Sequence, residues 1–410
     1  MKVKNILFAL LVLVCFVSCD NHSAEEFQIG KMYYDGESTT QDYAKALEWF
    51  TKAAKKGNSD ALCYIGLMYS EGKGVPQNDD KAIEYITKAA KKGNSEAQFY
   101  LGMFLLIKNE WSFYENEEEN YLSEGMEWLN KSANQGYSYA ICFLGYIYAV
   151  GTYGVTQDYT KAMEYLTKAT EKGNAMAEMA IGGMYYSGNG VTQDYAKAIE
   201  WYTKAAEHGN ITAQYQLGTM YYDGDGVTQD YKKAKDWFEK ATTNKDNSLF
   251  KDVDSQHKAQ YKLGDMYYHG YGVTQNYSKA AEFYEKVADI INAGTQQCLG
   301  DMYYYGEGVE QDYIKAAEWF EKAASDYLYS QYMLGCMYFY GEGVTQDYKK
   351  AFEWYEKAAE QGDSYAQYML SVMYYNGEGV SKNYAKAKEW CGKAAAKGHE
   401  KAREALKKYF

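Results

Sequence analysis

A short phrase in this chain carries the residue types that acid–base catalysis uses. It reads GVTQDYAKAIEWYTKAA from position 190 to 206, and close copies begin at Gly226, Gly272, Gly308, Gly343 and Gly379. A catalytic carboxylate needs a site that shifts its pKa, through burial or a like-charged neighbour. Glu200 and Lys204 instead stand four residues apart in a helical pattern, an order that stabilises an exposed ion pair by about 0.2–0.5 kcal/mol. The phrase therefore predicts a solvated charge stripe rather than a repeated active site.

Other sites for chemistry are also missing from the sequence pattern. The GDGV-type loops have no Gly-Lys-Ser/Thr after them and no strand before them, so they lack the features of a phosphate-binding loop. The five histidines are scattered and never stand four apart, as a helical metal pair would. No set of Ser, His and Asp or of Cys and His recurs. We expect no catalytic residue, no metal site, no cofactor and no small-molecule substrate.

Composition narrows the class of partner. The chain has 410 residues, a formal net charge of −13, 17% aromatic residues and one proline. A nucleic-acid binder needs clustered lysine and arginine to replace the counterions of phosphate, so this charge argues against one. It argues equally against electrostatic adsorption to an anionic lipid surface.

The first residues, MKVKNILFALLVLVCFVSCD, have the pattern of an export signal. Two lysines precede an apolar run that is too short to span a bilayer comfortably. The segment FVSC resembles the bacterial lipobox, and that resemblance implies cleavage after Ser18 and lipid attachment to Cys19. We expect a signal peptide at 1–18, a short linker at 19–24 and an anchor in a bacterial cell envelope, facing the periplasm or the surface. The alternative is an ordinary secretory signal with an incidental cysteine.

The chain is an array of repeats. The valine of the phrase recurs at intervals of 36, 36, 46, 36, 35 and 36 residues, at Val155, Val191, Val227, Val273, Val309, Val344 and Val380. A second phrase such as AQYQLGTMYYDGDG precedes each copy. Counting both phrases gives ten units, which begin near positions 25, 61, 97, 140, 177, 213, 259, 295, 330 and 366.

Each unit has the pattern of two helices. In the first half Ala213, Leu217, Met220 and Gly224 recur at spacings of 4, 3 and 4, which is one face of a helix. Paired glycines end this helix because glycine accepts the positive φ of a chain reversal. Asp230 then supplies a helix start. One such hairpin cannot bury both of its faces, so neighbouring units must stack. The predicted fold is an all-α, right-handed α/α solenoid of about ten helix-turn-helix repeats.

The two phrases together resemble the Sel1-like repeat, a relative of the tetratricopeptide repeat. The resemblance covers an array at 25–401, followed by a helical tail at 402–410, with longer insertions near 108–122 and 242–257 that fall between helices. It implies a scaffold that binds other proteins. Some cysteine-rich secreted members resemble β-lactam-binding or β-lactam-hydrolysing proteins, but they carry a cysteine pair in each repeat, which this chain lacks.

The first helices are the predicted binding surface. Numbered from the alanine that opens each unit, positions 3, 7 and 10 point away from the core positions 1, 5, 8, 9 and 12. Tyrosines recur there, and they supply large contact area at low entropic cost. The predicted concave groove consists of Tyr215, Tyr222, Tyr261, Asp265, Tyr268, Asp301, Tyr304, Tyr332, Phe339, Tyr368 and Tyr375. The alternative is that these rings pack only against neighbouring helices.

We therefore predict a non-enzymatic, lipid-anchored scaffold that binds a protein or peptide along this aromatic groove. The acidic balance weakly favours partners with basic segments. One alternative is an envelope enzyme that binds or hydrolyses β-lactams, and another is a surface factor that engages a host protein.

Overall fold

The structure is a computed structural model that describes residues 22–36, 39–115, 121–244 and 252–410. Within these ranges the chain forms helices and no strand, so the all-α prediction is confirmed. The helices fall into two compact units, residues 1–208 and 209–410. The first unit contains α2 (His22–Asp35), α3 (Tyr43–Lys55), α4 (Ser59–Glu71), α5 (Asp79–Lys91), α6 (Ser95–Glu115), α7 (Tyr121–Asn134), α8 (Ser138–Val150), α9 (Tyr159–Thr170), α10 (Ala175–Ser187) and α11 (Tyr195–Glu207).

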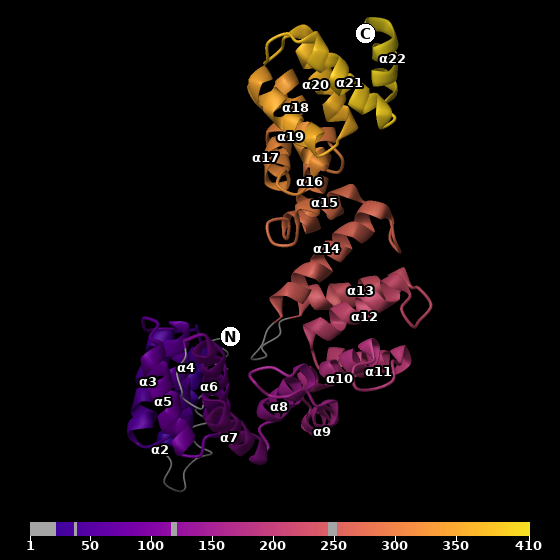
Figure 1. Cartoon of the computed structure of the whole chain (residues 1–410). Helices are drawn as coiled ribbons and strands as arrows, with labels where there is room; N and C mark the ends of the chain where they lie inside the picture. The colour runs from indigo at the N-terminus through magenta and orange to yellow at the C-terminus, as the bar shows by residue number, and fades with distance from the viewer. Residues whose placement is uncertain (1–21, 37–38, 116–120, 245–251) are drawn as a thin grey trace, which may run out of the picture. The chain divides into compact units, whose positions relative to one another are not determined.

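The second unit continues the same alternation. It contains α12 (Ile211–Asp223), α13 (Tyr231–Thr243), α14 (Val253–His269), α15 (Tyr277–Glu285), α16 (Ala293–Tyr305), α17 (Tyr313–Ala323), α18 (Leu328–Tyr340), α19 (Tyr348–Glu360), α20 (Ser364–Asn376), α21 (Tyr384–Ala396) and α22 (Glu400–Tyr409). Figure 1 shows the helices of each unit following one another in chain order. An even-numbered first helix packs most extensively against the odd-numbered second helix that follows it. The predicted series of about ten helix-turn-helix repeats is confirmed.

Glycine ends each regular first helix. Gly341 caps α18 in the left-handed conformation, with its backbone N–H donating to the carbonyl of Met337. The second glycine of the same loop, Gly343, has φ +70° and lies against the backbone of Tyr313 at the start of the preceding second helix. A β-carbon there would stand 2.2 Å from the Tyr313 carbonyl oxygen. The loop of one repeat therefore rests on the helix start of the repeat before it, and this contact requires glycine.

The aspartate of the phrase begins the second helix. Asp194 Oδ1 accepts the backbone N–H of Lys197 at 3.0 Å, which satisfies a donor that the first turn leaves free. The glutamine before it holds the loop, because Gln193 Nε2 donates to the Tyr186 carbonyl and to the Tyr195 hydroxyl at 2.9 and 3.1 Å. The glutamine and the aspartate of the phrase thus have structural roles that their neighbours explain.

Small residues let the two helices of a repeat approach closely. Ala213, Leu217 and Met220 of α12 are at most 1% exposed, as their spacing predicts. A β-carbon on Gly218 would lie 2.5 Å from the ring of Phe238 on α13. The aromatic ring occupies the space that the missing side chain leaves, so the large and the small residue depend on each other.

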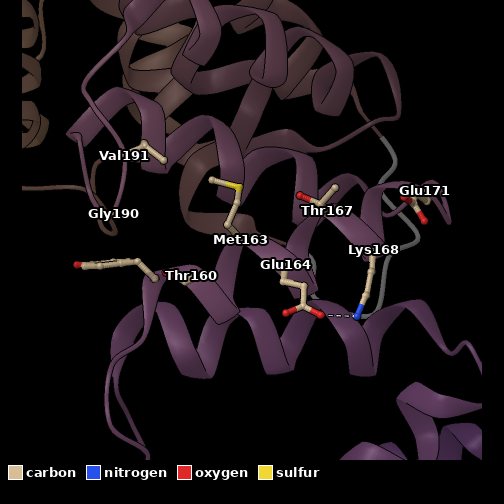
Figure 2. A pocket seen from close by; sticks show the side chains of 9 residues that line it. Thr160, Met163, Glu164, Thr167, Lys168, Glu171, Gly190 and Val191 are labelled. Carbon is tan, nitrogen blue, oxygen red and sulfur yellow. Dashed lines mark hydrogen bonds and ion pairs between the residues drawn. The ribbon is translucent and has the colours of Figure 1, made fainter.

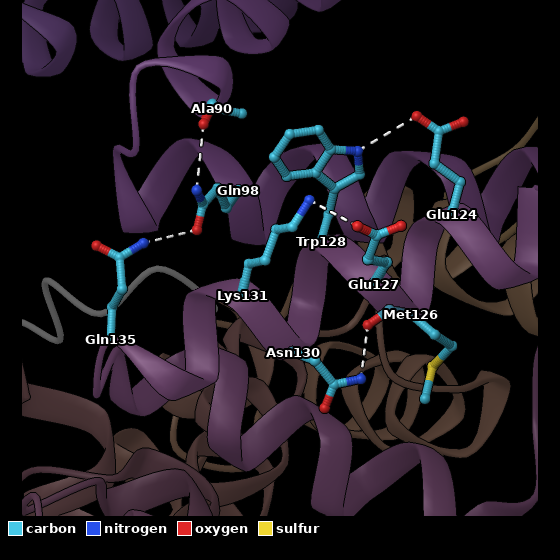
Figure 3. A network of polar contacts seen from close by, with 9 residues as sticks. All are labelled: Ala90, Gln98, Glu124, Met126, Glu127, Trp128, Asn130, Lys131 and Gln135. Atoms are coloured by element: carbon cyan, nitrogen blue, oxygen red, sulfur yellow. Dashed lines mark hydrogen bonds and ion pairs between the residues drawn. The ribbon is translucent and has the colours of Figure 1, made fainter.

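Buried glutamines tie successive repeats together. Gln98 on α6 is 5% exposed and donates through Nε2 to the Ala90 carbonyl at the end of α5, at 3.1 Å. Gln135, directly after the second helix α7 of the same repeat, donates to Gln98 Oε1 at 2.7 Å (Figure 3). Gln331 and Gln361 repeat the second of these contacts in the other unit, at 3.1 Å. A buried amide costs stability unless it is paired. The bond from Gln98 to Ala90 therefore helps to fix how two repeats stack, and the bond from Gln135 holds the two helices of one repeat together.

Three helix bounds differ from the sequence expectation. α2 begins at His22, inside the segment predicted as a linker. The insertion near 108–122 was expected between helices, but α6 continues through it to Glu115. Position 12 of this unit is Lys108 instead of the usual glycine, so nothing ends the helix there. The other insertion also extends a helix, because α14 begins at Val253. No described helix is long and apolar enough to cross a membrane.

Candidate functional site

All the groove residues predicted from the sequence lie on the first helices of the second unit. They belong to α12, α14, α16, α18 and α20, and every one of their side chains is partly exposed. They are therefore neither core residues nor free surface residues. The contacts below show what each group packs against.

The aromatic rings at position 10 pack onto the tyrosine that begins the second helix of the same repeat. The ring centres of Tyr222 and Tyr231 are 5.2 Å apart and edge-to-face. Phe339 and Tyr348 show the same arrangement at 5.2 Å. Because phenylalanine replaces tyrosine without changing this contact, ring packing is the shared property of position 10. Equivalent pairs join Tyr268 to Tyr277, Tyr304 to Tyr313 and Tyr375 to Tyr384.

The tyrosines at position 3 contact a core aromatic ring or the following repeat. Tyr332 lies 6.0 Å from the buried Tyr355. Tyr368 stacks on His399 at 4.7 Å. Tyr215 and Tyr261 contact Phe238 and Tyr284 in the same way as Tyr332 contacts Tyr355. Packing is thus established for these rings, while their role in binding stays a prediction.

The two predicted acidic residues have different surroundings. Asp265 is near the hydroxyls of Tyr222 and Tyr284, at 3.4 and 3.3 Å, and near His269 Nε2 at 3.7 Å. Asp301 has a buried Oδ1 without a hydrogen-bond partner. The pKa of Asp301 is raised to about 6, because the effect of burial, with a smaller contribution from Glu307, exceeds the lowering by the Tyr329 hydroxyl and the Gln297 amide. Of these two carboxylates, only that of Asp301 has a buried oxygen without a hydrogen-bond partner.

The sequence interpretation missed the most exposed aromatic residues of this face. Tyr305 and Tyr340 end α16 and α18, and they are 56% and 59% exposed. Both occupy position 11, one turn after position 7 on the same helix face, so the helical period could have found them. Glu342, in the glycine loop after α18, was also missed, and its carboxylate accepts the Tyr304 hydroxyl at 2.6 Å.

Lysines are more frequent on the second helices of this unit than on the first, although the first helix α14 contains Lys258 and Lys262. α16, α18 and α20 contain no lysine or arginine, whereas the second helices α13, α15, α17, α19 and α21 all contain lysine. Seven of these second-helix lysines across the chain lie over a tryptophan three residues earlier, with Nζ 3.8–4.3 Å from the ring centre. The Glu–Lys stripe forms in part. Lys204 pairs with Glu200 at 2.9 Å. In the copy of the phrase that begins at Gly308, Lys322 pairs with Asp289 and not with Glu318, the glutamate four residues before it.

Other features of the described residues do not form a reaction centre. No group of three or more His, Cys, Asp or Glu side chains is placed to hold a metal ion within the described ranges. None of Cys63, Cys142, Cys298, Cys336 and Cys391 forms a disulfide.

An open hollow of about 540 Å³ lies between α9 and the loop of the next repeat (Figure 2). Met163, Glu164 and Lys168 line it, and the last two form an ion pair at 2.6 Å. Cys19 lies outside the described residues.

Comparison with known proteins agrees with this architecture. The Sel1 repeat family matches residues 26–58, 59–94, 95–137, 138–174, 175–210, 211–246, 257–289, 299–326, 328–363 and 364–399. No curated protein matches the chain. A protective antigen of uropathogenic Escherichia coli strains is 32% identical, over 95% of this chain and 88% of that one, with a TM-score of 0.45.

A Sel1 repeat protein from Oxalobacter formigenes is 30% identical, over 80% of this chain and 91% of that one, with a TM-score of 0.49. Sel1 repeat proteins are generally protein-interaction scaffolds. With ten matched repeats over most of its length, the chain belongs to the Sel1 repeat family.

Proposed function

We propose that this protein is a non-enzymatic scaffold that binds a protein or peptide on the aromatic face of its first helices. The observation that carries this proposal is the exposure of Tyr305 and Tyr340 beside the partly exposed Tyr304 and Phe339. Large rings at such exposure cost hydration energy, and a partner that covers them recovers it. Tyrosine is also the residue type enriched where binding energy concentrates.

The exposed rings are packed against neighbouring rings, which favours binding. Tyr304 and Tyr305 are edge-to-face at 4.9 Å, and Phe339 and Tyr340 at 5.0 Å. Each exposed tyrosine therefore rests on a ring that is itself packed against a second helix. A surface already ordered in the free protein loses little side-chain entropy when a partner binds.

A photo-crosslinking amino acid at position 340 tests this function in the cells that make the protein. A matched control carries the same group at Ile314, a 61% exposed residue of the second helix α17. We expect one discrete crosslinked species from position 340 and none from position 314. Crosslinks of equal pattern and yield at both positions, or none at position 340, would refute binding at this face.

We also propose that the protein is a lipoprotein held in a bacterial envelope. The motif FVSC before Asp20 supports lipid attachment at Cys19. Replacing Cys19 with alanine should abolish fatty-acid labelling and release the protein from membranes, because acyl chains supply the anchor. Cys15→Ala is the matched control, since it removes the other cysteine of the same segment and should leave labelling intact. Continued labelling of the Cys19→Ala protein would contradict the proposal.

A further inference from the structure

We propose that a lysine or arginine side chain of the partner binds over Tyr268 and beside Asp301. The proposal rests on the proposed function and adds the chemistry of the ligand. One repeat earlier, the chain fills the equivalent place with a cation of its own. Lys262 Nζ lies 4.4 Å from the ring centre of Tyr222, and the hydroxyl of that tyrosine is 3.4 Å from Asp265.

The same three positions recur in the next repeat with the cation removed. Tyr222 and Tyr268 are both at position 10, and Asp265 and Asp301 are both at position 7 of the following first helix. Position 4 of that helix is Lys262 in α14 but Cys298 in α16. The tyrosine and the aspartate are therefore retained where the lysine is absent.

Among the described residues, the charges that act on Asp301 and its neighbours include no cation in the place of Lys262. Asp301 and Glu307 both raise the pKa of Tyr268, after the larger effect of burial, to about 12. Burial, Asp301 and Asp265 raise the pKa of Cys298 to about 11. Within the part of the chain that the structure describes, no lysine or arginine is among the main groups that shift the pKa of Asp301, Tyr268 or Cys298. The site is acidic and aromatic, which suits a cation that can lie on a ring face.

The site is continuous with the exposed aromatic face. The Tyr329 hydroxyl interacts with both Asp301 and Tyr305, and Tyr305 contacts Tyr304 at 4.9 Å. Tyr304 in turn donates to Glu342. A peptide lying on Tyr305 and Tyr340 can therefore place a basic side chain at Asp301 without leaving this surface.

A labelled peptide tests the inference. The probe is a fluorescein-labelled peptide of alternating lysine and glycine, and its binding to the purified full chain is followed by fluorescence anisotropy. The same peptide with acetylated lysines is the ligand control, because acetylation removes the charge. We expect the unmodified peptide to bind and the acetylated one to bind at least about tenfold more weakly.

Two pairs of variants separate this site from general attraction to an acidic protein. Asp301→Asn should weaken binding about tenfold, whereas Glu318→Gln, the same charge change on exposed α17, should change it less than about twofold. Cys298→Lys supplies the missing cation and should also weaken binding about tenfold, while Cys298→Met should change it less than about twofold. Circular dichroism confirms that each variant is folded.

The reverse substitution gives a second readout. Lys262→Met removes the ammonium group that lies over the ring of Tyr222, and we expect it to add a second peptide site without weakening the first.

Equal loss of affinity in the Asp301→Asn and Glu318→Gln proteins would overturn the inference, as would undiminished binding to Cys298→Lys. If the lysine peptide does not bind but position 340 still captures a partner, the inference fails and the proposed function stands. If neither occurs, both fail.

Discussion

Gly343 offers a direct test of the conclusion that the repeated phrase is structural. Gly343→Ala would place a β-carbon 2.2 Å from the Tyr313 carbonyl oxygen and 2.3 Å from its carbonyl carbon. Gly93→Ala is the matched control, because Gly93 also has positive φ, +90°, but has nothing within 4 Å of the added carbon. Both substitutions share the backbone strain, and only the first adds a clash between repeats.

The free-energy cost of the backbone strain and that of the clash between repeats can be estimated separately. Left-handed backbone costs an alanine about 1–2 kcal/mol, and the stiffer unfolded chain offsets about 0.4–1 kcal/mol of that cost. We therefore expect Gly93→Ala to lower the free energy of unfolding by about 1 kcal/mol. Overpacking adds about 1–3 kcal/mol, and the clashing atoms are backbone atoms that cannot rotate away, so Gly343→Ala should cost about 2–4 kcal/mol.

Urea unfolding followed by far-ultraviolet circular dichroism measures the decrease in the free energy of unfolding for both variants. Repeat arrays can unfold in parts, so hydrogen exchange at the amides of α17 and α18 should accompany it. We expect faster exchange at this junction in Gly343→Ala alone. Equal destabilisation of the two variants, with unchanged exchange at the junction, would refute the stacking role of the glycine. Loss of partner binding in a fully stable Gly343→Ala protein would instead place the loop in the binding site.

Three further predictions follow from the same structure. Asp301→Asn should raise the free energy of unfolding at pH 8 by about 1–2 kcal/mol, after discounting for partial exposure, because the folded pKa of about 6 exceeds the ordinary 3.8. This gain should disappear as the pH falls from 6 to 3.8, and urea titrations at several pH values measure it. Asp347→Ala removes the acceptor for two backbone N–H groups at the start of α19 and should cost about 1 kcal/mol in the same assay. The combined Tyr222→Ala, Tyr268→Ala and Tyr304→Ala variant should lower the melting temperature, because each ring packs on a second helix; an unchanged melting temperature with lost partner capture would make these rings ligand contacts only.

Local signals explain why so much of the fold could be predicted from the sequence. A glycine that must adopt positive φ, such as Gly341, and an aspartate that accepts a first-turn N–H, such as Asp194, act within a few residues of the chain. Such short-range interactions mark helix ends in any context. The same reasoning explains the incorrect loop near 108–122, because the absent glycine at Lys108 was a visible sign that α6 would continue.

Contacts between repeats could not be predicted in this way. Gly343 touches Tyr313, thirty residues earlier, and Lys322 pairs with Asp289 instead of Glu318. Neither partner follows from helical spacing, because both depend on how one hairpin stacks on another. The groove residues show the same limit. Helical spacing places them on the first helices, but their half-buried state comes from second-helix rings such as Tyr231 and Tyr355.

The division between repeated and varied positions indicates where function is encoded. The glycines, a capping aspartate or asparagine and, in most repeats, the loop glutamine have the same contacts in successive repeats, so they serve stacking whatever the protein binds. Position 11 of the first helices is exposed, and position 4 is partly exposed at Lys262 and Cys298 although it is buried at Met333. Position 4 changes from Lys262 to Cys298, and position 11 changes from His269 to Tyr305. A substitution at a repeated position should therefore cost stability in any repeat, whereas a substitution at a varied position should change the ligand in one repeat only.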